Sequence, residues 1–153
     1  MMKSGFHRWG MVLVAGLMAP TLALGAAEPE DIIKYRQAAM KASGGHMAAS
    51  AVIVKGKVPF QGQLLGHARA LEQLNHGLAS LFPEGSDFGK TKALEAVWKD
   101  RAEFDKAART AEEKAKAFAK AVAGKDLKAA AAAHKDLADA CSACHKKFRK
   151  KDD

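Results

Sequence analysis

Residues 126–150 read DLKAAAAAHKDLADACSACHKKFRK, and this stretch carries both cysteines of the 153-residue chain. Its many alanines and lysines favour a helix, and Asp126 is a good N-cap for that helix. Apolar side chains recur at spacings of three and four, which is the period of a helix with one buried face. The residues predicted for that face are Leu127, Ala131, His134, Leu137 or Ala138, Cys141, Cys144 or His145, and Phe148.

Three further segments with the same period precede this one, at about residues 29–54, 61–82 and 91–123. The pair Gly44-Gly45 is expected to interrupt the first segment, and Gly124 is expected to cap the third at its C-terminal end. Mostly short connections join the four segments. The sequence therefore predicts an all-α domain, an antiparallel four-helix bundle that occupies residues 27–153.

Residues 1–26 have the composition of a secretory signal peptide. Lys3 and Arg8 give a basic start, residues 11–24 are apolar, and small residues follow. The apolar run is shorter than the roughly 20 residues that span a bilayer, so we expect cleavage between about residues 25 and 28 rather than a membrane anchor. The mature chain is then predicted to be a soluble periplasmic protein that does not insert into a membrane.

The formal net charge is +8, and it falls to +6 when Lys3 and Arg8 leave with the signal peptide. Aromatic residues do not alternate with the basic ones, and most charges lie on predicted helix faces beside acidic residues. This pattern argues against a nucleic-acid-binding protein. A basic exported protein is instead suited to an acidic surface on a protein partner.

The two cysteines stand in the motif Cys141-Ser142-Ala143-Cys144-His145, which is the pattern of c-type haem attachment. Residues three and four apart share one face of a helix, so both thiols can reach the vinyl groups of one porphyrin while His145 falls beneath the iron. One covalent haem c per chain is therefore predicted. Cys141 and Cys144 are the predicted attachment points, and His145 is the predicted proximal iron ligand.

A disulfide, a redox-active pair and a zinc site fit the two cysteines less well than haem attachment does. A disulfide would close a very small loop and contribute little stability. A thioredoxin-like redox pair expects a strand before its helix, and a zinc site expects a second pair of ligands at metal spacing. The sequence supplies neither of these features.

The chain resembles the cytochrome c′ family, the class II c-type cytochromes, over essentially the whole of its mature length. The haem motif near the C-terminus carries most of the resemblance. Shorter stretches that add to it are Lys34-Tyr35-Arg36-Gln37-Ala38-Ala39-Met40, Val54-Lys55-Gly56 with Pro59-Phe60, Trp98 with Phe104, and Cys144-His145-Lys146-Lys147-Phe148-Arg149. The resemblance implies a four-helix bundle, in agreement with the helical periods.

The resemblance implies one of two states for the sixth coordination position of the iron. In cytochromes c′ proper the iron is five-coordinate and high-spin and binds nitric oxide or carbon monoxide. The low-spin cytochrome c-556 type supplies a methionine from its first helix. The matching residue here is Met40, and Met40-Lys41-Ala42-Ser43-Gly44-Gly45-His46-Met47 is more similar to the low-spin branch. Met40 is therefore the predicted sixth ligand; a role in core packing is the alternative, and Met47 is a weaker candidate.

The resemblance implies further contacts with the haem. Arg36 and Gln37 match family positions near the haem propionates, and Arg149 matches a position at the haem edge. A surface ion pair is the alternative for Arg36. We expect no ligand role for three other histidines. His46 is expected to face solvent, and His67 and His134 are expected to lie in the core or at its boundary.

Together these predictions favour a periplasmic one-electron carrier whose iron has a histidine and a methionine ligand. The alternative is a protein with an open distal site that binds nitric oxide or carbon monoxide. A peroxidase-like enzyme needs an acid–base pair beside the iron, whereas the first predicted helix offers methionines, small residues and aliphatics there. No enzymatic activity is therefore predicted. The expected partner is a redox protein, and the resemblance allows either a monomer or a homodimer.

Overall fold

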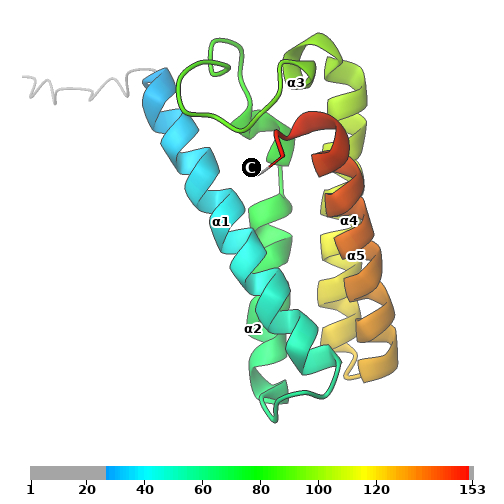
Figure 1. The fold of residues 1–153 in the computed structure, drawn as a ribbon. Coiled ribbons are helices and arrows are strands. Elements are labelled where there is room, and N and C mark those ends of the chain that lie inside the picture. Colours follow the sequence, from blue (N-terminus) through cyan, green and yellow to red (C-terminus); the bar gives the residue numbers. More distant parts are fainter. Residues whose placement is uncertain (1–26, 152–153) are drawn as a thin grey trace, which may run out of the picture.

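The computed structural model describes residues 27–151, in which four long helices pack as an antiparallel bundle (Figure 1). The predicted signal peptide and the last two residues lie outside the described residues. Within residues 27–151 there is no β-strand, and none of the helices is long and apolar enough to cross a membrane. The elements are α1 (Pro29–Val54), α2 (Gln61–Asn75), the 3₁₀ turn η1 (Leu78–Leu81), α3 (Ala96–Lys99), α4 (Arg101–Ala123) and α5 (Leu127–Phe148). The prediction of an all-α bundle is confirmed.

The N-terminal ends of α1 and α5 form where the sequence predicts them. α1 begins with Pro29, whose fixed φ suits a first helical turn, and Glu30 and Asp31 follow at the positive end of the helix dipole. At the start of α5, the Asp126 carboxylate accepts a hydrogen bond of 2.9 Å from the backbone N–H of Ala129. This cap satisfies one of the N–H groups that a first helical turn leaves without a partner.

The second predicted helix is shorter than expected, and the third is divided. α2 ends at Asn75, and Gly77 takes a left-handed conformation with φ of 62° that leads into η1. Residues 91–95 are not helical, and α3 is separated from α4 at Asp100, whose ψ of 44° lies outside the helical range. Apolar residues keep the helical spacing of three and four across these breaks, so the helical period alone does not predict where the helices end.

One of the two predictions about glycines is wrong, and the other is confirmed. Gly44 and Gly45 do not interrupt α1, which is helical along its whole length. The cost of a glycine in a helix is only about 1 kcal/mol, and the packing of the rest of α1 exceeds it. At the end of α4, Gly124 is the C-cap as predicted; it keeps a right-handed conformation, and the left-handed residue is Lys125, with φ of 58°.

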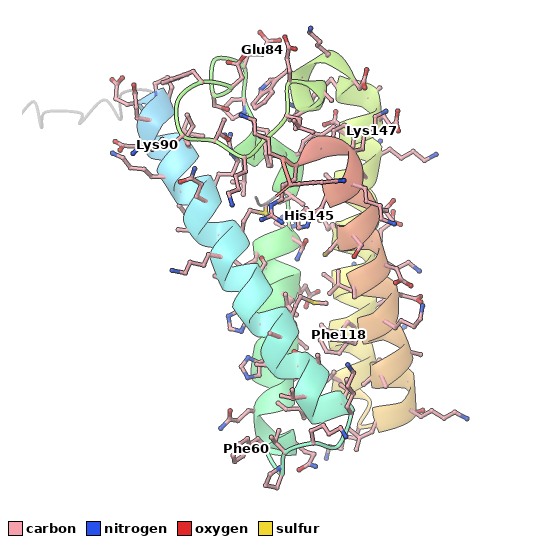
Figure 2. The ribbon with its side chains drawn as sticks, viewed as in Figure 1. Phe60, Glu84, Lys90, Phe118, His145 and Lys147 are labelled. Carbon is pink, nitrogen blue, oxygen red and sulfur yellow. The ribbon has the colours of Figure 1, made fainter. Side chains whose placement is uncertain are left out.

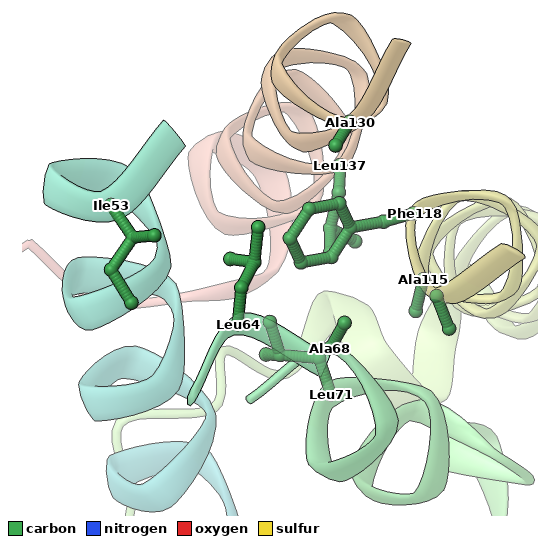
Figure 3. Packing of buried hydrophobic residues seen from close by; sticks show 9 residues of the cluster. Ile53, Leu64, Ala68, Leu71, Ala115, Phe118, Ala130 and Leu137 are labelled. Atoms are coloured by element: carbon green, nitrogen blue, oxygen red, sulfur yellow. The ribbon is translucent and has the colours of Figure 1, made fainter. Parts of the chain in front are cut away.

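The core of the bundle divides into two clusters of buried residues. The first cluster is built around Phe118, whose side chain is fully buried (Figure 3). The second cluster contains Phe82, Phe104 and Phe148, whose rings meet edge to face with centroids 4.8 and 5.2 Å apart. The other buried members are Ile53, Leu64, Ala68, Leu71, Ala115, Ala119, Ala130 and Leu137 in the first cluster, and Leu78, Val97, Ala108 and Ala111 in the second.

The buried face of α5 differs slightly from the predicted one. Leu127 is 51% exposed, and Ala131 is only partly buried, because Ala130 takes the core position at this end of the helix. From Ala130 onward the core-facing residues follow spacings of four and three, and the two half-buried cysteines continue this series. Both cysteines therefore stay on the core-facing side of α5.

Candidate haem-attachment site

Cys141, Cys144 and His145 lie in the C-terminal part of α5, and Figure 2 shows His145 on the side of this helix that faces α1. Both cysteines are free thiols and are half-buried. Cys141 packs against the first cluster, and Cys144 packs against the second. The two thiols therefore span the boundary between the clusters, which suits the attachment of one large flat cofactor.

Burial keeps the two thiols neutral. It raises the pKa of Cys144 to about 11, with a further contribution from the neighbouring Cys141, and it also raises the pKa of Cys141. In a redox-active pair of cysteines, at least one thiol has a lowered pKa. These raised pKa values argue against the thioredoxin-like alternative.

The surroundings of His145 favour the neutral form of its side chain, which is the form that binds a metal ion. Partial burial and the positive charge of Arg149, one turn further on, lower the pKa of His145. A neutral imidazole has a lone pair to donate to iron, whereas an imidazolium has none. The neutral histidine and the two thiols form a donor set that fits a c-type haem.

Met40 is a half-buried residue of α1 that packs against the second cluster, which Cys144 also contacts. Met47, two turns further along α1, packs against the first cluster, which Cys141 contacts. Met40 therefore shares its part of the core with the cysteine that directly precedes His145, whereas Met47 does not.

Arg36 is 3% exposed and fixes the loop 76–95 to α1. Its guanidinium lies over the Phe82 ring, 4.6 Å from the centroid, and donates four hydrogen bonds of 2.9–3.1 Å. The acceptors are the carbonyl oxygen of Leu81, Oγ and the carbonyl oxygen of Ser86, and Oγ1 of Thr91. Desolvation lowers the pKa of Arg36. This burial rules out the surface ion pair, and the propionate contact stays a prediction.

The exposed Gln37 donates a hydrogen bond to the carbonyl oxygen of Lys90 in the same loop.

The loop 76–95 is also joined to the end of α5. Ala93 and Arg149 form an isolated antiparallel bridge, so the chain leaves the helix at Arg149 rather than near residue 150 as predicted. Two backbone hydrogen bonds of 2.9 and 2.8 Å hold the bridge, from Leu94 to Phe148 and from Lys150 to Lys92. The loop therefore links α1 to the end of α5 that carries His145, and it keeps Arg149 close to that residue.

The histidines outside the haem motif have defined partners. His134 is buried, and its Nε2–H donates to the carbonyl oxygen of Met47 at 3.1 Å, because a carbonyl oxygen only accepts. The prediction of a satisfied core histidine is confirmed there. His46 is not solvent-facing as predicted, because it is partly buried and its Nδ1 lies 2.9 Å from Nδ1 of His67. The sequence does not reveal this pair, since its members belong to different helices.

Arg36→Ala is expected to lower the free energy of unfolding by about 2–4 kcal/mol, because it leaves the loop acceptors without their charged donor. Urea unfolding of the haem-loaded protein measures this change. The matched control is Arg69→Ala, since Arg69 is an exposed arginine of α2, and it should change the stability by less than about 0.5 kcal/mol. A loss for Arg36→Ala as small as that of the control would show that Arg36 does not fix the loop.

Comparison with known proteins agrees with this fold and this donor set. The family described as Cytochrome C′ matches residues 31–149. Cytochrome c′ of Pararhodospirillum photometricum is 38% identical over 124 residues, a match that covers 80% of this chain and 99% of that protein. Cytochrome c-556 of Rhodopseudomonas palustris is 30% identical over 152 residues, a match that covers 92% of this chain and 97% of that protein.

Solved structures share the bundle. The nitric oxide complex of a cytochrome c prime variant from Alcaligenes xylosoxidans has a TM-score of 0.76 at 29% identity, and the match covers 84% of this chain and 100% of that chain. Cytochrome c′ from Rubrivivax gelatinosus has a TM-score of 0.76 at 30% identity, with 80% and 98% covered. A four-helix bundle with Cys-x-x-Cys-His near its C-terminus defines a class of haem proteins. This chain belongs to the cytochrome c′ family, whose members carry covalent haem c.

Proposed function

We propose that this chain is an exported one-electron carrier of the periplasm, with haem c attached through Cys141 and Cys144. In this proposal His145 is the proximal ligand of the iron and Met40 is the sixth ligand. The assignment of Met40 as the sixth ligand rests on its packing against the cluster that also contacts Cys144. Because Cys144 directly precedes His145 in the chain, this shared packing supports Met40 as the sixth ligand. The similarity of residues 40–47 to the low-spin branch supports the same assignment.

The haem supplies the one-electron couple of Fe(III) and Fe(II), and residues of this chain set the conditions for that couple. Met40 and His145 would hold the iron, and a thioether ligand in addition to an imidazole would favour the reduced iron and raise its potential. The second cluster, against which Met40 packs, would shield that side of the iron from water. The two ligands stand on packed helices, so they need to move little when the charge of the iron changes.

We infer that the end of α5 contacts an acidic surface on a redox partner. Lys146, Lys150 and Lys151 are exposed around the bridge between the loop 76–95 and the C-terminal segment. Lys147 is instead paired with acidic residues of the α4 end, with a distance of 3.3 Å to the Asp100 carboxylate. A positive surface close to the proposed iron ligands would steer an acidic partner toward the haem.

A second candidate is a five-coordinate haem protein that binds nitric oxide or carbon monoxide on the α1 side of the iron. The comparisons favour this candidate, because the relative at 38% identity is named cytochrome c′ and the Alcaligenes xylosoxidans structure with a TM-score of 0.76 is a nitric oxide complex. A further cytochrome c prime variant from that organism, at 30% identity and a TM-score of 0.75, is bound to carbon monoxide. In this candidate Met40 packs beside the open position without binding the iron.

The intact mass of the purified periplasmic protein is expected to exceed, by one haem, that of a chain cleaved between residues 25 and 28. The red colour should stay with the polypeptide after extraction with acidified acetone, because thioether bonds resist that treatment. A mass without haem, or colour that passes into the acetone, would contradict covalent attachment. A chain that keeps Met1 in the membrane fraction would instead contradict export and cleavage.

A further inference from the structure

His46 of α1 and His67 of α2 form a pair of imidazoles that the proposed electron carrier does not use. Their Nδ1 atoms lie 2.9 Å apart, and their ring centroids lie 5.2 Å apart with the planes inclined at 57°. Both side chains are partly exposed, so ions in solution can reach them. The pair therefore brings together two side chains of a kind that transition metals prefer.

The contact between the two rings requires a shared proton. Two Nδ1 atoms at hydrogen-bond distance require that one ring donates its N–H and the other accepts it. When the donor ring carries its proton on Nε2 instead, both Nδ1 lone pairs are available and both rings stay neutral. Neutral imidazole is the form that binds metal ions, so a cation can take the place of the shared proton without changing the charge of either ring.

We propose that His46 and His67 together bind one divalent transition-metal ion that prefers imidazole, with Cu²⁺ bound more tightly than Zn²⁺. Metal–nitrogen bonds of about 2.0–2.1 Å place two adjacent ligand nitrogens about 2.8–3.4 Å apart, from square-planar to tetrahedral angles. The observed separation of 2.9 Å lies at the square-planar end of this range, which is the geometry of Cu²⁺. The two nitrogens already have this separation, and the rings admit the ion when both lone pairs turn toward a common point.

Water completes the coordination of this ion. Among residues 27–151, no group of three or more His, Cys, Asp or Glu side chains is placed to share a metal ion, so the chain supplies two ligands. His46 and His67 are both partly exposed, so a hydrated ion can reach the pair from solution. A bound ion would cross-link α1 to α2 and stabilise the native state according to its occupancy.

Titration of the ferric, haem-loaded protein with Cu²⁺ is expected to show one ion per chain whose electron paramagnetic resonance spectrum carries splittings from two nitrogen ligands. The ferric state is used so that the haem does not reduce the copper. His46→Ala and His67→Ala should each weaken this binding by about tenfold or more, because one imidazole remains. Zn²⁺ should compete for the site, and Cu²⁺ should raise the melting temperature of the wild type but not of either variant.

His76→Ala is the matched control, because His76 is an exposed histidine whose Nδ1 lies 2.8 Å from the Glu112 carboxylate, outside the pair. This variant should keep the two-nitrogen copper signal. An unchanged haem spectrum shows that each variant is folded, and His67→Asn replaces His67→Ala if the alanine variant does not fold. Copper binding that survives substitution of either member of the pair, or that disappears with His76→Ala, would overturn the proposal.

Discussion

Met40→Ala is expected to convert the haem iron from a six-coordinate low-spin state to a five-coordinate high-spin state. Alanine has no atom that reaches the iron, so the histidine remains as the only protein ligand. The reduced wild type should show sharp, split visible bands, and the oxidised wild type should show a weak band near the red end that arises from sulfur ligation. Both features should be lost in the variant, and optical spectra of the two redox states measure this.

The same substitution should open the iron to small ligands. Carbon monoxide has to displace the thioether in the wild type and should bind slowly, whereas it should bind rapidly to the Met40→Ala protein. The reduction potential should fall as well, because the thioether favours the reduced iron. Stopped-flow mixing with carbon monoxide and a potentiometric titration test these two expectations separately.

Met47→Ala is the matched control for this experiment, since Met47 is a methionine on the same helix that packs against the first cluster. It should leave the spectrum unchanged and destabilise the protein by about 2–5 kcal/mol if the cavity does not close. A wild type that is already high-spin, with a spectrum that Met40→Ala does not alter, would remove the main support for the electron carrier. Met40 would then be a packing residue, and gas binding would be the better account.

The parts of this protein that follow from local sequence could be predicted well. α1 begins and ends where it is predicted, because Pro29 starts the helix and Gly56, with φ of 64°, takes the chain into the next turn. The haem motif is local too, since its three functional residues lie within little more than one helical turn. Periods and motifs of this kind depend on neighbours a few positions away, so one sequence is enough to detect them.

The parts that depend on distant contacts could not be predicted. Arg36 bonds to residues 45 to 55 positions away, in a loop whose path the helical period does not describe. The pair His46 and His67 spans 21 positions and depends on how α1 crosses α2. A single charged or polar residue on an apolar face signals that a partner exists, but it does not say which one. The propionate contact predicted for Arg36 therefore rests on the resemblance and on the need of a charge at an apolar face for a partner.

Loss of the haem is the expected result of removing both cysteines. Cys141→Ala and Cys144→Ala should each lower the yield of haem-bound protein, because one thioether bond can still form. The double variant should reduce covalent haem to near zero. Ser142→Ala is the matched control, since Ser142 is an exposed residue between the two cysteines, and it should leave the yield unchanged. Haem staining of denaturing gels and intact mass measure the covalent haem of each variant.

His145→Ala separates attachment of the haem from ligation of the iron. Its thiols are intact, so the thioether bonds can form and the mass of one haem should remain. The proximal ligand is lost, so the spectrum of the protein that retains haem should differ from that of the wild type in both redox states. An unchanged spectrum in His145→Ala would show that another residue binds the iron on the proximal side. Covalent haem in the double cysteine variant would show that attachment does not depend on the motif, and either result would refute the site proposed for α5.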